Sequence, residues 1–193
     1  MSMRVLVTGF GPFPGAPRNP SAQIAAAIDA RRLARLGIAL DRMVLPVVYD
    51  AIAPLLADCR ADVVLHIGLA SRRRHVSIET RAVNRLSLLA PDAARRRATR
   101  MAITPGGPAS LAANAPVAQI AAMFRRRGAT QLSNDAGAYI CNQTLYLSLA
   151  RRGARVGFIH VPRLEHAQRI ARLAADVTAA IILCAAQARR AAL

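Results

Sequence analysis

One cysteine, Cys141, follows a turn of small residues at the start of a predicted helix. The turn covers residues 134–138 and the helix covers residues 141–152. A thiol in this position experiences the positive end of the helix dipole and unpaired backbone N–H groups, and both favour the thiolate, the nucleophilic form of cysteine. The position therefore predicts a catalytic nucleophile. The alternative is a buried structural cysteine, because free cysteine is among the residue types most often found in protein cores.

The other two cysteines do not share this setting. Cys59 ends an amphipathic segment and Cys184 lies in an apolar C-terminal segment, so we expect both in the core. All three cysteines are far apart in the chain, which argues against a disulfide framework and indicates a reducing compartment. Their spacing also lacks the pairs that are typical of a zinc site. We therefore expect chemistry without a metal.

A cysteine nucleophile needs a general base, and His160 is the best placed of the four histidines. It ends an apolar stretch and follows Cys141 at a separation that leaves room for one helix and one returning strand, a βαβ unit that would place the two side by side. His66 lies inside a buried strand and is expected to be a hydrogen-bonded core histidine. We expect His75, beside three arginines, and His166, on a polar helical segment, at the surface.

The group that orients the base is expected to be Glu79, one of only two glutamates in the chain. It lies in an alternating, half-buried strand over residues 75–83, where an unpaired carboxylate would be costly, and pairing with a histidine would remove that cost. The second glutamate, Glu165, begins the last helix, where an acid suits the helix dipole. Asp135, next to the cysteine turn, remains a competitor, although aspartate is also a common turn residue.

Short apolar runs and amphipathic segments alternate along the chain. The runs predict strands over residues 4–8, 38–47, 62–67, 75–83, 130–133 and 155–161. The amphipathic segments predict helices over residues 19–36, 50–60, 117–127, 141–152 and 164–190, with residues 86–116 irregular. The first helix opens with Asn19 as its cap and Pro20 in its first turn.

This alternation predicts one α/β domain over residues 1–193, with a largely parallel, twisted central sheet and helices on both faces. In such sheets, sites gather beyond the carboxyl ends of the strands. That rule selects loops 9–15 and 68–74, the cysteine turn and His160.

The net charge of +17 comes from 27 arginines, with no lysine. The arginines occur in short groups without interleaved aromatic residues, so the charge does not by itself predict a nucleic-acid interface. The longest apolar run, near residues 177–186, is too short to cross a bilayer. The N-terminal residues lead directly into a strand rather than a signal peptide. We expect a cytoplasmic protein that contacts neither nucleic acid nor membrane.

Four segments carry a more specific pattern. They are VLVTGFGPF (5–13) with NPS (19–21); HIGLA (66–70) with IE (78–79) and AVN (82–84); SNDAG (133–137) with YICN (139–142); and GFIHVP (157–162). Together, and in this order, they resemble the pyroglutamyl-peptidase I (pyrrolidone-carboxylate peptidase) family over nearly the whole chain.

The resemblance implies a three-layer α/β/α sandwich and a cysteine peptidase that removes an N-terminal pyroglutamate (5-oxoproline) from peptides through an acyl-enzyme. It implies a catalytic triad of Glu79, Cys141 and His160. It also implies that Phe10 and Phe13 line the pocket for the lactam ring, with Gly9 and Gly11 allowing close backbone approach. A homo-oligomer, often a homotetramer, and the absence of a cofactor follow from the same resemblance.

The chain departs from the family pattern in three places. Leu89 occupies a position where the family usually carries an arginine near the active site, and residues 109–114 lack the expected aromatic residues. The segment between Cys141 and His160 is shorter than in well-known members. These departures support a second hypothesis, a catalytically weak or silent paralogue that binds small molecules or peptides.

Overall fold

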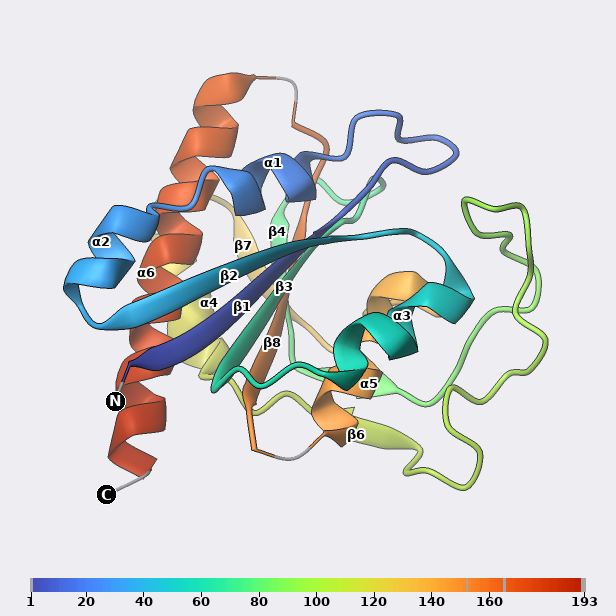
Figure 1. The fold of residues 1–193 in the computed structure, drawn as a ribbon. Helices are drawn as coiled ribbons and strands as arrows, with labels where there is room; N and C mark the ends of the chain where they lie inside the picture. Colours follow the sequence, from blue (N-terminus) through green and yellow to red (C-terminus); the bar gives the residue numbers. More distant parts are fainter. Residues whose placement is uncertain (1, 152, 165, 192–193) are drawn as a thin grey trace.

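A central sheet of six strands organises the fold, in the order β2-β1-β3-β8-β4-β7 (Figure 1). The computed structural model describes the chain apart from residues 1, 152, 165 and 192–193. The six strands are β1 (Met3–Phe10), β2 (Ile38–Leu45), β3 (Val63–Leu69), β4 (Val76–Glu79), β7 (Thr130–Ser133) and β8 (Arg155–Val161). Two further strands, β5 (Arg81–Val83) and β6 (Ser110–Ala112), pair in a small separate sheet.

The strands of the main sheet run in two directions. β2, β1, β3 and β8 are mutually parallel, and β4 is parallel to β7. The two groups meet at an antiparallel pair, where β4 lies beside β8 with Ser77 opposite His160. All of β3 and nearly all of β8 are buried, as expected for central strands that are covered on both faces.

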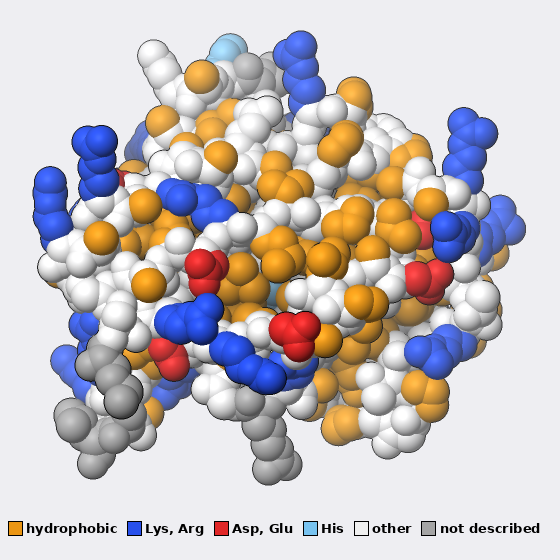
Figure 2. All heavy atoms as spheres, in the orientation of Figure 1, with side chains coloured by type: hydrophobic (Ala, Val, Ile, Leu, Met, Phe, Trp, Pro, Cys, Tyr) orange, Lys and Arg blue, Asp and Glu red, His pale blue; other side chains and the backbone are white. Residues whose placement is uncertain are grey.

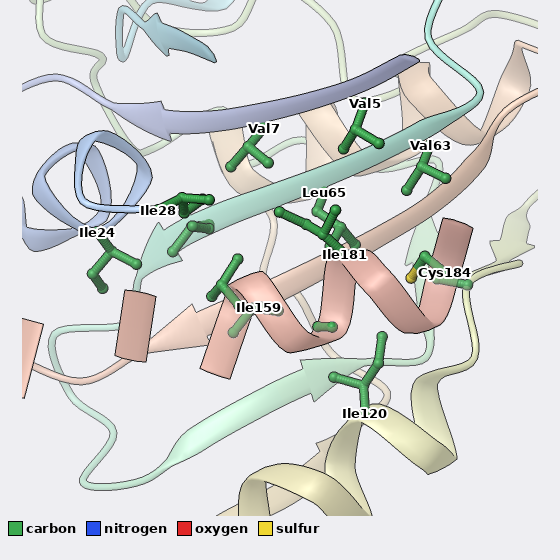
Figure 3. Packing of buried hydrophobic residues seen from close by; sticks show 14 of the residues in the cluster. Val5, Val7, Ile24, Ile28, Val63, Leu65, Ile120, Ile159, Ile181 and Cys184 are labelled. Carbon is green, nitrogen blue, oxygen red and sulfur yellow. The ribbon is translucent and has the colours of Figure 1, made fainter. Parts of the chain in front are cut away.

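Helices cover both faces of the sheet, which confirms the predicted largely parallel sheet and the three-layer α/β/α arrangement. They are α1 (Pro20–Ala26), α2 (Ala30–Arg35), α3 (Tyr49–Ala57), α4 (Val117–Arg125), α5 (Ile140–Ala150) and α6 (Ala167–Ala191). One face packs against α1, α4 and α6, as Figure 3 shows through Ile24, Ile120 and Ile181. The other face packs against α3 and α5 through residues such as Ile52 and Leu145.

The C-terminal helix α6 is long and apolar enough to cross a membrane by length and composition alone. Val177, Ile181 and Cys184 on this helix are fully buried against the sheet. These residues therefore belong to the core of the domain.

Two predicted elements are each divided in the structure. The expected helix over residues 19–36 is two helices, because Asp29 accepts a hydrogen bond from the Arg32 backbone N–H and caps α2 after a break. The expected strand over residues 75–83 is also divided, because its second half pairs with β6 rather than with the main sheet. The Asn19 cap and Pro20 at the start of α1 are confirmed. The predicted end of the cysteine helix, Arg152, lies outside the described residues.

Candidate active site

Glu79 and His160 form a buried pair on the face of the sheet covered by α5. The Nδ1 atom of His160 lies 2.7 Å from Oε1 of Glu79. The Glu79 side chain is fully buried and the His160 side chain is 4% exposed. Because a carboxylate can only accept, Nδ1 carries the proton in this contact and Nε2 keeps its lone pair. The imidazole is therefore held in the tautomer that a general base requires.

The antiparallel contact between β4 and β8 creates this pair. His160 lies opposite Ser77, so Glu79, two residues further along β4, is its diagonal neighbour on the same face. The expected βαβ unit is wrong, because β7 and β8 run in opposite directions and β4 lies between them. Helix α5 still returns the chain from the cysteine to β8, but the strand before the helix is at the edge of the sheet.

Cys141 is the second residue of α5, which begins at Ile140 after Tyr139 as the capping residue. Its Sγ atom lies against Gly68, at 3.0 Å from the position that a Cβ atom of residue 68 would occupy. Gly68 in turn pairs with His160 across β3 and β8. The thiol and the imidazole thus belong to one corner of the sheet, although the described residues contain no hydrogen bond between them.

The thiol is not the preformed thiolate that the sequence indicates. Burial, followed by the nearby charge of Glu79, raises the pKa of Cys141 to about 12, while Arg73 and a backbone hydrogen bond act in the opposite direction. Desolvation therefore outweighs the helix terminus, and the thiol is neutral at physiological pH. A neutral thiol needs a general base before it can act as a nucleophile.

Arg73 is a member of this cluster that the sequence analysis did not select. Its Nη1 atom donates to Oε1 of Glu79 at 2.7 Å, and its Nη2 atom donates to the backbone carbonyl of Asp135 at 2.6 Å. The strand-end rule selects loop 68–74 as a whole but does not single out Arg73 within it. A signal was available, because a buried glutamate needs a countercharge and the arginines of this loop are close to it along the chain.

A small cavity of about 40 Å³ opens beside the thiol. Phe10, Phe13 and Tyr139 contribute aromatic walls, and Cys141 lies at its edge. The other lining residues are Asn19, Val47, Leu69 and Ile140. The structure thus brings both candidate phenylalanines to the candidate nucleophile.

The loop that carries the two phenylalanines is fixed by polar contacts at its end. The Phe10 backbone N–H donates to Ser21 Oγ, which donates to Asn19 Oδ1, and Asn19 Nδ2 donates to the Gly11 carbonyl.

The two glycines of this loop were expected to let the backbone approach a ligand closely, and the structure gives Gly9 another role. A Cβ at Gly9 would lie 2.6 Å from backbone atoms of α1, so this glycine permits helix packing rather than ligand approach. Gly11 is in ordinary contact only.

The other histidines lie away from this cluster. His66 is buried with Nδ1 2.7 Å from Thr8 Oγ1 and Nε2 2.9 Å from Ser148 Oγ, as expected of a satisfied core histidine. His166 is exposed, as predicted. The expectation of a surface position for His75 is wrong in part, because the residue is half-buried and its Nε2 atom is buried without a partner among the described residues.

Asp135 does not orient the base in this structure. Its carboxylate accepts the backbone N–H of Gly137 at 2.8 Å and thereby closes the turn before α5. The second glutamate, Glu165, lies outside the described residues. Cys184 is buried in the core as expected, whereas Cys59 is only partly buried at the end of α3.

The segment after β5 is irregular but firmly attached to the site. The hydroxyl groups of Tyr49 and Tyr139 donate to the carbonyls of Ala90 and Pro91, and the two rings meet edge to face. Leu89, which precedes this attachment, is 81% exposed and does not line the cavity.

Across the described part of the chain, no three His, Cys, Asp or Glu side chains gather as a metal site would require.

Comparison with known protein families finds a match over nearly the whole chain. A family model described as pyroglutamyl peptidase matches residues 3–188. The chain belongs to the pyroglutamyl peptidase family. It is therefore a peptidase, and the resemblance expected from the four sequence segments is confirmed.

Individual relatives match over most of their length. A pyrrolidone-carboxylate peptidase of Pyrococcus furiosus is 35% identical, covering 83% of this chain and 81% of the relative. One from Cupriavidus taiwanensis is 36% identical, covering 86% and 81%. The solved structure of a mutant pyrrolidone carboxyl peptidase from Pyrococcus furiosus superposes with a TM-score of 0.83 at 30% identity, covering 96% of this chain and 99% of the other. The Thermus thermophilus enzyme gives 0.78 at 33% identity, covering 93% and 97%.

Proposed function

We propose that this peptidase removes an N-terminal pyroglutamate from peptides, with Cys141 as nucleophile, His160 as general base and Glu79 as the group that orients the base. The observation that supports these roles best is the 2.7 Å contact between the buried Glu79 carboxylate and His160 Nδ1, at the sheet corner occupied by Cys141. The names of the related enzymes support the substrate.

The reaction would proceed through an acyl-enzyme. His160 Nε2 takes the thiol proton as the sulfur attacks the carbonyl that links pyroglutamate to the next residue, and Glu79 stabilises the imidazolium that forms. Backbone N–H groups in the first turn of α5 would receive the oxyanion. His160 then protonates the leaving amine, and water releases pyroglutamate.

The cavity favours a flat, uncharged ring. Phe10 and Phe13 offer aromatic walls, and the Asn19 side chain is already occupied by Gly11 and Ser21, so the lactam edge would bond to backbone groups. A volume of about 40 Å³ holds roughly three water molecules, which is less than the lactam ring needs. The half-buried Phe13 would therefore move outward on its loop when substrate enters.

The decisive experiment measures fluorophore release from a pyroglutamyl amide and from the matching prolyl amide. A pocket that hydrogen-bonds the lactam carbonyl rejects a ring without it by on the order of 10⁴-fold. We expect cleavage of the pyroglutamyl amide, little cleavage of the prolyl amide, and no turnover after Cys141→Ser. Comparable cleavage of both amides would contradict the substrate assignment.

Alkylation with iodoacetamide followed by peptide mapping tests the nucleophile separately. Substrate should protect Cys141 from labelling, and Cys59→Ala should retain turnover. Pyroglutamyl peptide that binds without being cleaved would instead support the second hypothesis, a silent paralogue, for which the raised thiol pKa is the relevant observation.

A further inference from the structure

Arg73 joins two parts of the site that are otherwise held by different elements. One nitrogen of its guanidinium donates to Glu79 Oε1 on β4, and another donates to the Asp135 carbonyl in the turn that leads to α5. Oε1 is the same oxygen that contacts His160. A single planar side chain therefore fixes the carboxylate behind the base and the turn that carries the nucleophile.

The buried Glu79 carboxylate is paired with this guanidinium and with the His160 ring. It is fully buried, and its second oxygen, Oε2, has no hydrogen-bond partner among the described residues. The Arg73 side chain is 25% exposed, so the guanidinium reaches from the surface to the buried acid. An isolated buried carboxylate would be strongly disfavoured, and arginine is suited to the contact because its geometry is planar and its charge is permanent.

We propose that Arg73 is a positioning residue for the reaction, which holds the Glu79 carboxylate aligned on His160 and ties it to the turn that carries Cys141. This inference rests on the proposed function for the identity of the reacting groups. It goes beyond the Glu79, Cys141 and His160 triad by adding the cation on which their charge balance depends.

The charges that face Cys141 act in opposite directions. The Glu79 charge raises the pKa of the thiol and the Arg73 charge lowers it. Tyr139, which also borders the thiol, has its own pKa raised to about 12 by burial and remains neutral. The Asp135 carboxylate is turned toward the Gly137 backbone. Arg73 is therefore the cation that contacts the buried Glu79 carboxylate directly and counters the effect of its charge on the thiol.

The direction of the effect follows from the charge of Arg73, which lowers the pKa of the Cys141 thiol. Removal of that charge must therefore raise the pKa of the thiol and move the pH dependence of its alkylation toward higher pH. The acid limb of kcat/KM, which belongs to the coupled thiol and imidazole, should move in the same direction.

The test compares Arg73→Gln, which removes the charge, with Arg73→Lys, which keeps a cation but loses the fork that spans Glu79 and Asp135. Arg72→Ala, an exposed neighbour in the same loop, is the matched control. Two pH profiles are measured for each protein: kcat/KM on the pyroglutamyl amide, and the rate of Cys141 alkylation by iodoacetamide. Circular dichroism establishes that each variant is folded.

We expect Arg73→Gln to shift both profiles upward by about one pH unit or more and to lower kcat/KM on the order of 10- to 100-fold, the usual range for residues that orient a reacting group from behind. Arg73→Lys should lower the rate but keep the profiles near those of the parent, and Arg72→Ala should match the parent throughout.

Profiles of Arg73→Gln that coincide with the parent would overturn the proposal, as would an equal shift in Arg73→Lys. The alkylation profile needs no turnover, so it separates this proposal from the proposed function. A parent that does not cleave the amide, together with an alkylation profile that still shifts in Arg73→Gln, would retain the role of Arg73 beside the thiol and remove the pyroglutamyl substrate assignment.

Discussion

At the scale of single residues, the Glu79 carboxylate holds the imidazole of His160 by a buried contact. Its Oε1 atom contacts Nδ1 at 2.7 Å inside the core, where water cannot replace it. Asp135 was the competing carboxylate, and its side chain closes the turn before α5 instead. Neutralising Glu79 and neutralising Asp135 are therefore expected to affect the reaction differently.

Glu79→Gln should lower kcat much more than it raises KM, because the amide can hold the ring in the wrong tautomer while the cavity is unchanged. Loss of this orienting charge costs on the order of 10⁴-fold in a related arrangement of groups. Steady-state kinetics on the pyroglutamyl amide provides the measurement. A normal kcat in Glu79→Gln, combined with a large loss in Asp135→Asn, would transfer the orienting role to Asp135.

Sequence reasoning at this scale identified which residues meet but not their electrostatic state. Glu79 was selected because a carboxylate in a half-buried strand needs a partner, and the structure gives it two, His160 and Arg73. The thiol was assigned a low pKa from its place at a helix start. Its actual desolvation depends on the packing of α5 against β3, which no local pattern reveals.

At the scale of elements, the strongly apolar strands were predictable and the element divisions were not. β3 and β8 are short, continuous apolar segments, and this pattern favours a buried strand over other secondary structure. The division between β4 and β5 could not be predicted, because the alternating pattern continues through Thr80 while the pairing partner changes from β7 to β6. The reversed direction of β4 was also hidden, although it creates the diagonal contact between Glu79 and His160.

Gly68 on β3 lies where the packing between β3, β8 and α5 is close to the Cys141 thiol. A Cβ atom there would lie 2.7 Å from the Phe158 ring and 3.0 Å from Cys141 Sγ. Gly68→Ala should therefore destabilise the fold by about 1–3 kcal/mol through overpacking and should alter the alkylation rate of Cys141. Urea unfolding and iodoacetamide labelling provide the two measurements.

Gly128→Ala is the control for Gly68→Ala, since no atom lies within 4 Å of the added Cβ atom. It should stay within about 0.5 kcal/mol of the parent, as surface substitutions usually do. Equal effects of the two substitutions would show that the close packing at Gly68 has no energetic consequence.

At the scale of the whole molecule, the arginines on the face drawn in Figure 2 do not form one continuous basic surface. Figure 2 shows them on the visible face as separate side chains, many at the periphery, with apolar residues between them. Several are used in the fold: Arg42 donates to the carbonyls of Ala25 and Ile28, and Arg189 donates to the carbonyls of Leu36 and Gly37. The sequence predicts that many arginine groups close helices or lie in loops, and the structure shows which backbone carbonyls Arg42 and Arg189 reach.

The stability of the molecule toward acid should depend on His66, which is buried between Thr8 and Ser148. Burial lowers its pKa from 6.5 to about 3. Above pH 6.5 the ring is neutral in both folded and unfolded chains, so its full contribution is present. As the pH falls from 6.5 toward about 3, the unfolded chain binds a proton that the folded chain does not, and stability is lost at about 1.4 kcal/mol per pH unit.

Urea unfolding between pH 7 and pH 4 should show this slope in the parent and its loss in His66→Gln. Carboxylates contribute to both curves and cancel in the difference. The exposed His166→Gln serves as the control and should keep the parental slope, whereas identical slopes for all three proteins would mean that His66 does not remain neutral in the folded core.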